Sequence, residues 1–334
     1  MLSIFIFTIN AILPVITVML LGYFLKSIGM FTKEFLKVAN KVVFYVCLPV
    51  LLFKNLLDVE KLSDINWTVI IYVVIVILII FVIGLFITIF IEDRTDKGVV
   101  LQCVFRSNFA MIGVALADLI AGSEGVISAA IISAFSIPIF NVLSVVSLTV
   151  FDKNNKLNAR EQIFPIFKKI LKNPLIIGIL AGLIALMIKP TFLSITSEEF
   201  REGFSFIDTS LGYIARVASP LSLLVLGGQF DFNRVAGYKK QIIISTLSRN
   251  VMAPVLGLGV AVLLHKSGIV NFNAGVFASL VALFGTPVAV ASAIMAEEMG
   301  SNGELAGQLV VWTTVLSAFS MFVVVFCLRL IGVI

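Results

Sequence analysis

Two short groups of polar or helix-breaking residues lie inside long apolar stretches of the chain. The first group is Arg106, Ser107, Asn108 and, slightly later, Gly113; the second is Thr286 and Pro287. Backbone at membrane depth leaves helical geometry only where protein or water satisfies its N–H and C=O groups. Two such interruptions, one in each half of a chain, are typical of a transporter binding site at a repeat interface.

The chemistry that these interruptions predict is the binding of a carboxylate. A helix that restarts near the bilayer midplane presents an N-terminal end with about half a positive charge, and its free N–H groups suit an anion. Ser107, Asn108 and Thr286 add side-chain donors. The alternative is that these side chains only cap the half-helices. Pro287 is expected to force a break, and Gly113 permits unwinding.

Arg106 is the cation next to the first interruption. A cation inside a span costs about 2.5–3.5 kcal/mol on insertion scales, so it needs a water-filled cavity, an acidic partner or a route to the lipid headgroups. Arg106 therefore either attracts an anion beside the break or extends its side chain to the cytoplasmic edge of the membrane.

Three further polar residues inside the spans are candidate substrate-binding residues. They are Ser136 and Asn141, on either side of Pro138 in the fifth span, and Gln229 at the inner end of the seventh. Hydrogen bonding between helices is the alternative role for all three.

Four polar residues in spans are interpreted as structural. In the eighth span, Arg249 beside Asn250 either pairs with an acidic residue of another span or replaces a coupling cation. In the seventh, Arg216 and Asp208 are predicted to form a polar pair near the outer edge.

The composition indicates a protein of membrane-spanning helices. The 334-residue chain is 60% hydrophobic and only 13% charged, whereas a soluble domain carries about 25% charged residues. The apolar runs are continuous, which excludes the alternating pattern of a β-barrel. The net charge of +5 comes mainly from short loops, so it reflects topology and not nucleic-acid binding. No motif for a nucleophile, a nucleotide or a metal stands out, and we expect neither an enzyme nor a cofactor.

Ten stretches are long enough to cross a bilayer, which takes about 20 apolar residues. They are residues 5–25, 36–57, 67–91, 98–120, 126–151, 166–188, 205–230, 240–264, 273–296 and 305–330. Lys and Arg concentrate in the odd-numbered loops, which places those loops in the cytoplasm and both termini outside the plasma membrane. The longest of them separates a first repeat (1–152) and a linker (153–165) from a second repeat (166–334). Each half has five spans, so the second half is inverted relative to the first.

Several segments resemble the auxin efflux carrier family. They are residues 40–53 (NKVVFYVCLPVLLF), Ser107-Asn108, Lys172-Asn173-Pro174, residues 286–290 (TPVAV) and residues 312–317 (WTTVLS). The resemblance extends over essentially the whole chain. The long hydrophilic loop of many plant carriers is absent, so the chain looks like the bacterial organic-acid permease branch. Residues 113–115 also lack the proline that plant carriers usually have after the Asn of the fourth span.

The resemblance implies a ten-helix inverted repeat in which the unwound fourth and ninth helices cross. It implies a scaffold domain of spans 1, 2, 6 and 7 and a moving transport domain of spans 3–5 and 8–10, which work as an elevator. It also implies small organic anions as substrates, such as malate, malonate or auxin-like aromatic acids. Elevator scaffolds often pair, so a homodimer through the scaffold is expected.

The leading hypothesis is a secondary transporter that moves small organic anions across the lipid bilayer by alternating access. A cation–proton antiporter of similar architecture would need buried carboxylates at the interruptions, and residues 107–113 and 285–291 contain none. A membrane-embedded hydrolase would need a nucleophile with a base, and no His or Lys lies in mid-span. A passive channel and a non-transporting receptor for organic acids remain alternatives. The coupling ion, proton or sodium, stays open.

Overall fold

The computed structural model describes residues 2–57, 66–152, 168, 171–195, 203 and 205–334, and these residues form helices and connecting turns. In the first half the helices are α1 (Leu2–Ser27), α2 (Lys33–Val42), η1 (Val43–Cys47), α3 (Leu48–Leu57), α4 (Trp67–Ile87), η2 (Thr88–Phe90), α5 (Arg94–Phe105), η3 (Phe109–Gly113) and α6 (Val114–Val150). In the second half they are α8 (Pro174–Ile195), α10 (Ser205–Gln229), η4 (Phe232–Tyr238), α11 (Lys239–Leu247), η5 (Ser248–Met252), α12 (Ala253–Lys266), α13 (Ala274–Gly285), α14 (Ala291–Glu298) and α15 (Gly303–Ile331).

The length and composition of these helices are those of a multi-pass membrane protein. In the described residues, six helical segments are long and apolar enough to cross a bilayer, and three shorter apolar segments accompany them. Two of the predicted spans are built from several helical pieces: residues 36–57 from α2, η1 and α3, and residues 240–264 from α11, η5 and α12. In both, a π-helical turn directly precedes the short helix that carries a proline, Pro49 or Pro254. A proline cannot complete the regular hydrogen-bond ladder, and a π turn accommodates the local mismatch.

The boundary predicted between the fourth and fifth spans, near residues 121–125, coincides with a kink inside α6. Two helical pieces meet there without the expected loop. The chain changes direction at Gly122 alone, with φ 59° and ψ −142°. Only glycine adopts this backbone conformation without strain, so a single residue replaces the expected loop.

The helices interrupted in the middle are the fourth and ninth of the predicted spans. The helix α13 ends at Gly285, and Thr286 is extended (φ −73°, ψ 155°). The residue before a proline is biased toward this conformation, because the proline ring clashes with a helical predecessor. The helix α5 ends at Phe105, and Arg106 is extended (φ −82°, ψ 125°) although no proline follows. The first break therefore needs a tertiary cause.

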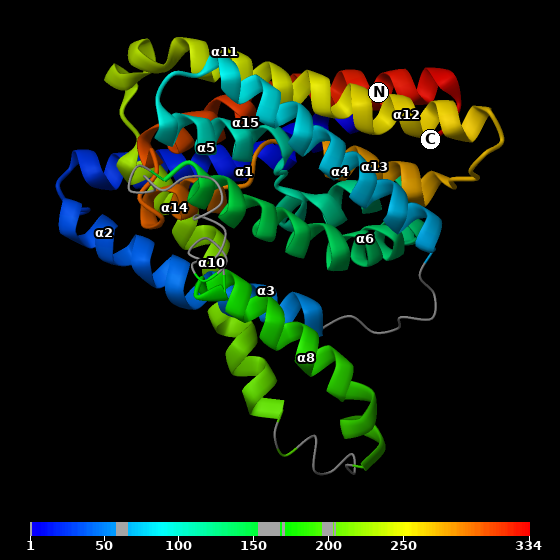
Figure 1. The fold of residues 1–334 in the computed structure, drawn as a ribbon, viewed down its shortest axis with the longest axis horizontal. Helices are drawn as coiled ribbons and strands as arrows, with labels where there is room; N and C mark the ends of the chain where they lie inside the picture. Colours follow the sequence, from blue (N-terminus) through cyan, green and yellow to red (C-terminus); the bar gives the residue numbers. More distant parts are fainter. Residues whose placement is uncertain (1, 58–65, 153–167, 169–170, 196–202, 204) are drawn as a thin grey trace.

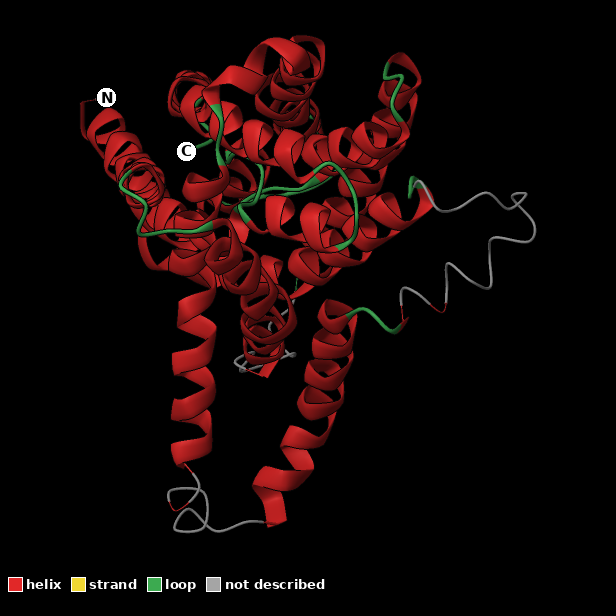
Figure 2. Ribbon diagram, turned by 90° about the vertical axis from the view of Figure 1, so that its left-hand side faces the viewer, coloured by secondary structure: helices red, strands yellow, loops and turns green. Residues whose placement is uncertain are grey.

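Helices α3, α8 and α10 lie together on one side of the molecule, and the parts of α8 and α10 nearest to residues 195 and 205 project beyond the rest (Figures 1 and 2). Glycines allow close approach of α8 to α3 and of α10 to α1. A Cβ atom on Gly178 would lie 2.5 Å from the carbonyl oxygen of Pro49, and one on Gly227 would overlap that of Met19. On the other side, α13 packs against α6 and α12.

Polar contacts near the loops form two sets, one at each end of the bundle. At one end of the bundle, Asn302 donates to Asp96 at 2.7 Å, and Gln241 donates to the same carboxylate at 3.0 Å. Asn40 donates to Glu298 there at 2.8 Å. These residues flank odd-numbered loops of the predicted topology. At the other end, Lys54 pairs with Asp208 and Lys189 donates to the carbonyl of Leu57, and these residues flank even-numbered loops.

Candidate functional site

The two interruptions contact each other directly. The backbone N–H of Asn108 donates to the carbonyl oxygen of Pro287 at 2.8 Å. This bond takes the N–H that would otherwise extend α5, so it is the tertiary cause of the first break. The N–H of Val288 donates to Thr313 Oγ1 of α15 at 3.3 Å, which supports the second break from the opposite side.

Arg249 lies where both broken helices end. Its side chain has no exposed surface, and every hydrogen bond that it makes to the described residues goes to a backbone carbonyl. The acceptors are Thr286 (Nε, 3.0 Å), Phe105 (Nη1, 3.2 Å), Leu283 (Nη2, 3.0 Å) and Phe284 (Nη2, 2.9 Å). The prediction that Arg249 pairs with an acidic residue is therefore wrong, because helix-end carbonyls take that place. Its neighbour Asn250 donates to the carbonyl of Thr313 at 2.9 Å.

A cavity of about 70 Å³ lies beside the two breaks, and we call it the central cavity. Its lining comes from both halves of the chain. The residues are Leu48, Leu51, Leu52, Asn55, Arg106, Ser107, Asn108, Ile137, Phe140, Asn141, Ala218, Ser219, Ser222, Ala289, Val290 and Ala291. None of these lining residues is acidic. The helix α14 starts at Ala291, so its N-terminal end lies at the cavity wall.

Arg106 is the one charged residue among the described residues of this lining, and it is 4% exposed. Its Nη2 donates to Asn141 Oδ1 at 3.0 Å, and its Nη1 lies against the sulfur of Met295. Asn141 is held in turn, because its Nδ2 donates to the carbonyl of Ile137 at 2.8 Å. The expected alternative, an Arg106 side chain that extends to the membrane edge, does not occur in this structure.

The remaining polar groups of the lining are amides and hydroxyls. The hydroxyl oxygen of Ser107 is buried and has no hydrogen-bond partner among the described residues. A buried hydroxyl without a partner costs free energy, about 1–3 kcal/mol, and a bound ligand can repay that cost. The cavity therefore offers a fixed positive charge, an unused hydroxyl and a helix N-terminus, which together suit an anion.

The structure brings four of the nine predicted binding residues to the central cavity, namely Arg106, Ser107, Asn108 and Asn141. The other five do not line it. Thr286 is fully buried and its hydroxyl donates to the carbonyl of Ala282 at 2.9 Å. Pro287 contributes its carbonyl to the contact with Asn108. Gly113 has ordinary helical angles (φ −61°, ψ −51°) and packs under the ring of Phe109.

Ser136 and Gln229 lie elsewhere. Ser136 is fully buried, with a hydroxyl that lacks a partner in the structure. Gln229 lines a separate cavity of about 310 Å³ together with Asp231, Glu297 and Glu304, and it hydrogen-bonds Glu297. Whether each of these residues faces the central cavity depends on the orientation of its helix about the helix axis. The sequence pattern does not specify that orientation.

Sequence reasoning missed the polar residues on the opposite wall, Asn55, Ser219 and Ser222. A signal for Ser219 and Ser222 exists, although not for Asn55. The segments 48–52 and 219–223 match each other in the two halves, and both segments lie on this wall, on α3 and α10. Corresponding positions of two repeats meet at the repeat interface, so the polar residues of these segments were candidates.

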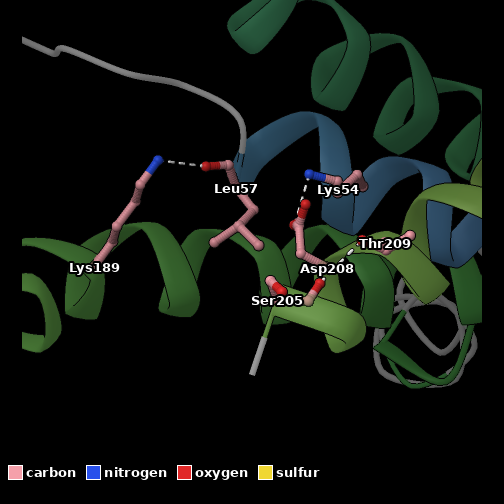
Figure 3. Close-up of polar contacts among 6 residues, drawn as sticks. All are labelled: Lys54, Leu57, Lys189, Ser205, Asp208 and Thr209. Carbon is pink, nitrogen blue, oxygen red and sulfur yellow. Dashed lines mark hydrogen bonds and ion pairs between the residues drawn. The ribbon is translucent and has the colours of Figure 1, made fainter. Parts of the chain in front are cut away.

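A second cavity, of about 560 Å³, shares Leu51, Asn55 and Ser219 with the central one, and we call it the outer cavity. Lys54, Asp208 and Arg216 also line it. Figure 3 shows Lys54 of α3 pointing at Asp208 of α10, at 2.7 Å. The predicted pair of Arg216 with Asp208 is therefore wrong, because Lys54 of the neighbouring helix reaches the carboxylate, and Arg216 is left exposed in the cavity.

Two comparisons place the chain among known proteins. A family model described as membrane transport protein matches residues 7–325. An uncharacterized transporter of Methanothermobacter thermautotrophicus is 25% identical over 325 residues, which cover 95% of this chain and 97% of that protein. The match extends over nearly the whole chain, in agreement with the motifs that resemble auxin efflux carriers. The chain therefore belongs to the membrane transport protein family, the family of the auxin efflux carriers, and it is a transporter and not an enzyme.

Proposed function

We propose that this protein is a secondary transporter of small organic anions, that is, of mono- or dicarboxylates such as malate or malonate or of auxin-like aromatic acids. The observation that carries the proposal is the central cavity. Arg106 gives it a buried positive charge, Ser107 gives it an unused hydroxyl, and its described lining holds no carboxylate. A carboxylate substrate would neutralise the guanidinium and accept a hydrogen bond from the hydroxyl.

The same observation argues against the antiporter alternative. A site for protons or metal cations at membrane depth uses buried carboxylates. The described lining of the central cavity instead carries one cation, Arg106, with amides and hydroxyls around it. An inorganic cation would meet like charge in this cavity, and an anion would meet the opposite charge.

The position of the cavity supports an elevator mechanism. One wall comes from α3 and α10, which belong to the expected scaffold of spans 1, 2, 6 and 7. The facing wall comes from the breaks after α5 and α13 and from α6, which belong to the expected transport domain. In this proposal the ten spans form a 5+5 inverted repeat, the interrupted spans cross at the bond between Asn108 and Pro287, and sliding of one wall past the other carries the anion across.

The proposed orientation puts both termini outside the plasma membrane. The outer cavity would then open to the exterior and lead to the central one, which would make this conformation an outward-open state. The exposed Arg216 at its wall would attract anions from solution. A homodimer would form through α3, α8 and α10, the part of the scaffold that lies on one side of the molecule (Figure 1).

The test is uptake of labelled malate, malonate and an aromatic acid into proteoliposomes, with and without sodium and with and without a pH gradient. We expect saturable uptake, exchange against internal substrate, and a loss of at least tenfold in Arg106→Gln and in Asn108→Ala. The control is Arg329→Gln, which removes an exposed arginine near the end of α15 and should transport normally.

Three results would contradict the proposal. Normal transport by Arg106→Gln would exclude the cavity as the binding site. Flux that neither saturates nor exchanges would favour a channel. Binding of an organic acid to purified protein, measured as a rise in unfolding temperature, without any flux would favour a receptor.

A further inference from the structure

We propose that Arg249 is the positioning residue of the transport site: one guanidinium joins the C-terminal ends of both broken helices and so fixes the residues of the central cavity. This inference builds on the proposed function, but the contacts that carry it are independent of any substrate. They are the four hydrogen bonds from Arg249 to carbonyls of residues 105, 283, 284 and 286.

A broken helix leaves carbonyl groups without partners at its C-terminal end. Outside a membrane, water would satisfy them. Here Phe105 and Phe284 are 1% exposed and Leu283 has no exposed surface, so water does not reach these groups from bulk solution. Leaving buried carbonyls unpaired is costly in an apolar environment. Arg249 has five N–H donors in a planar fork and satisfies carbonyls of two helices at once.

The positive charge of Arg249 is balanced by the two helix ends. Each helix C-terminus is equivalent to about half a negative charge, and the ends of α5 and α13 both face this guanidinium. Two such ends together balance one positive charge without an acidic side chain. This balance explains how a fully buried arginine exists here although its hydrogen bonds all go to carbonyls.

The held carbonyls are next to the residues that build the cavity. Phe105 precedes Arg106, and Thr286 precedes Pro287, whose carbonyl receives the N–H of Asn108. Movement of either helix end would therefore shift Arg106 and Asn108 relative to residues 289–291 on the same wall. The π turn η5 carries Arg249, and such turns are frequent at functional sites because they re-aim a side chain.

The first experiment is hydrogen exchange of purified protein, without any substrate, in Arg249→Ala, Arg249→Lys and the control Arg329→Ala. We expect faster exchange than in the wild type at both breaks, in peptides covering 105–113 and 283–291, for Arg249→Ala. Arg249→Lys should be intermediate, because a compact ammonium with three donors cannot reach four carbonyls in two helices. The control should match the wild type.

The second experiment measures uptake by the same variants in proteoliposomes. Arg249→Ala should lower kcat/KM for uptake at least tenfold, mainly because KM rises. Added guanidinium chloride at millimolar concentration should restore part of the uptake, whereas urea, a neutral planar analogue, should not. Arg249→Lys should retain more uptake than Arg249→Ala and serves as the folded variant if the alanine protein is unstable.

Two outcomes would overturn the inference. One is wild-type exchange at either break in a folded Arg249→Ala or Arg249→Lys protein, because the inference requires both ends to loosen together. The other is Arg249→Ala with normal KM and normal uptake. If the wild type transports no organic anion, the proposed function fails, and the exchange measurement still decides the role of Arg249.

Discussion

Arg106 and Asn141 form the polar pair at the centre of the cavity, with 3.0 Å between Nη2 and Oδ1. A hydrogen bond with one charged partner is worth about 1.5–3 kcal/mol, and Asn141 is itself fixed by the carbonyl of Ile137. The pair therefore holds the guanidinium in one place without neutralising it. An amide is suited to this role, because a carboxylate at the same position would cancel the positive charge to which the proposed anionic substrate would bind.

The substitution Asn141→Asp tests this argument. It places a carboxylate beside Arg106, and we expect it to compete with the substrate and raise the KM for anion uptake by at least tenfold, while Asn141→Leu causes a smaller rise. Proteoliposome uptake at varied substrate concentration measures both. The control is Asn66→Asp, which keeps the side-chain acceptor at the start of α4. An Asn141→Asp protein with an unchanged KM would show that Arg106 does not carry the substrate charge.

At the scale of residues, the sequence identifies candidate polar residues better than it predicts where their side chains point. Arg106, Ser107 and Asn108 were found because polar residues inside an apolar span are rare and require a reason. Thr286 belongs to an equally conspicuous group, yet its hydroxyl turns back to Ala282. Asn55 was missed because a single amide near a span end has an ordinary explanation, and only the packing of α3 against the breaks reveals it.

At the scale of elements, the two breaks differ in how far the sequence determines them. Pro287 makes the second break predictable from local chemistry. The first break has no proline, and its cause is the bond from Asn108 to Pro287 together with the bond from Arg249 to Phe105. Polar residues mark both breaks in the sequence, but local chemistry explains only the second, and the first depends on tertiary partners from distant parts of the chain.

Close packing of α1 against α10 gives a second prediction. A Cβ atom on Gly227 would overlap the backbone carbonyl of Met19, so Gly227→Ala should force the two helices apart. Overpacking of this kind costs about 1–3 kcal/mol, and we expect the unfolding temperature of the purified protein to fall by several degrees. Differential scanning fluorimetry in detergent measures it.

The matched control for that prediction is Gly259→Ala in α12, where, apart from the backbone of its own helix and its chain neighbours, no described atom lies within 4 Å of the added Cβ. Alanine favours a helix over glycine by about 1 kcal/mol, so this change should be neutral or stabilising. Equal unfolding temperatures for the two variants would mean that the α1–α10 contact is not tight in the native protein.

At the scale of the whole molecule, the polar contacts at the two ends of the bundle connect different parts. At one end they join the two walls of the central cavity, and at the other they lie within one wall. At the end opposite the outer cavity, Asn40 of α2 donates to Glu298 of α14, at 2.8 Å, and Asn173 lies against Met299. These contacts join the expected scaffold to the expected transport domain. At the outer end, Lys54 and Asp208 join α3 to α10 within the scaffold alone. In the proposed orientation, these contacts would close the cytoplasmic side of the central cavity.

In the proposed orientation, the bond between Asn40 and Glu298 should therefore stabilise the outward-open state. Asn40 is fully buried, and its loss as a donor to a carboxylate is worth about 1.5–3 kcal/mol, or roughly tenfold to a hundredfold in a population ratio. We expect Asn40→Leu and Glu298→Ala each to shift the protein toward the inward-open state.

The readout is the rate at which a membrane-impermeant maleimide, added outside, labels Ser219→Cys in a Cys327→Ser background. Both variants should slow the labelling, and the double variant should add little to either, because the two residues act through one bond. Additive effects, or labelling as fast as in the parent protein, would show that this contact does not hold the two walls together.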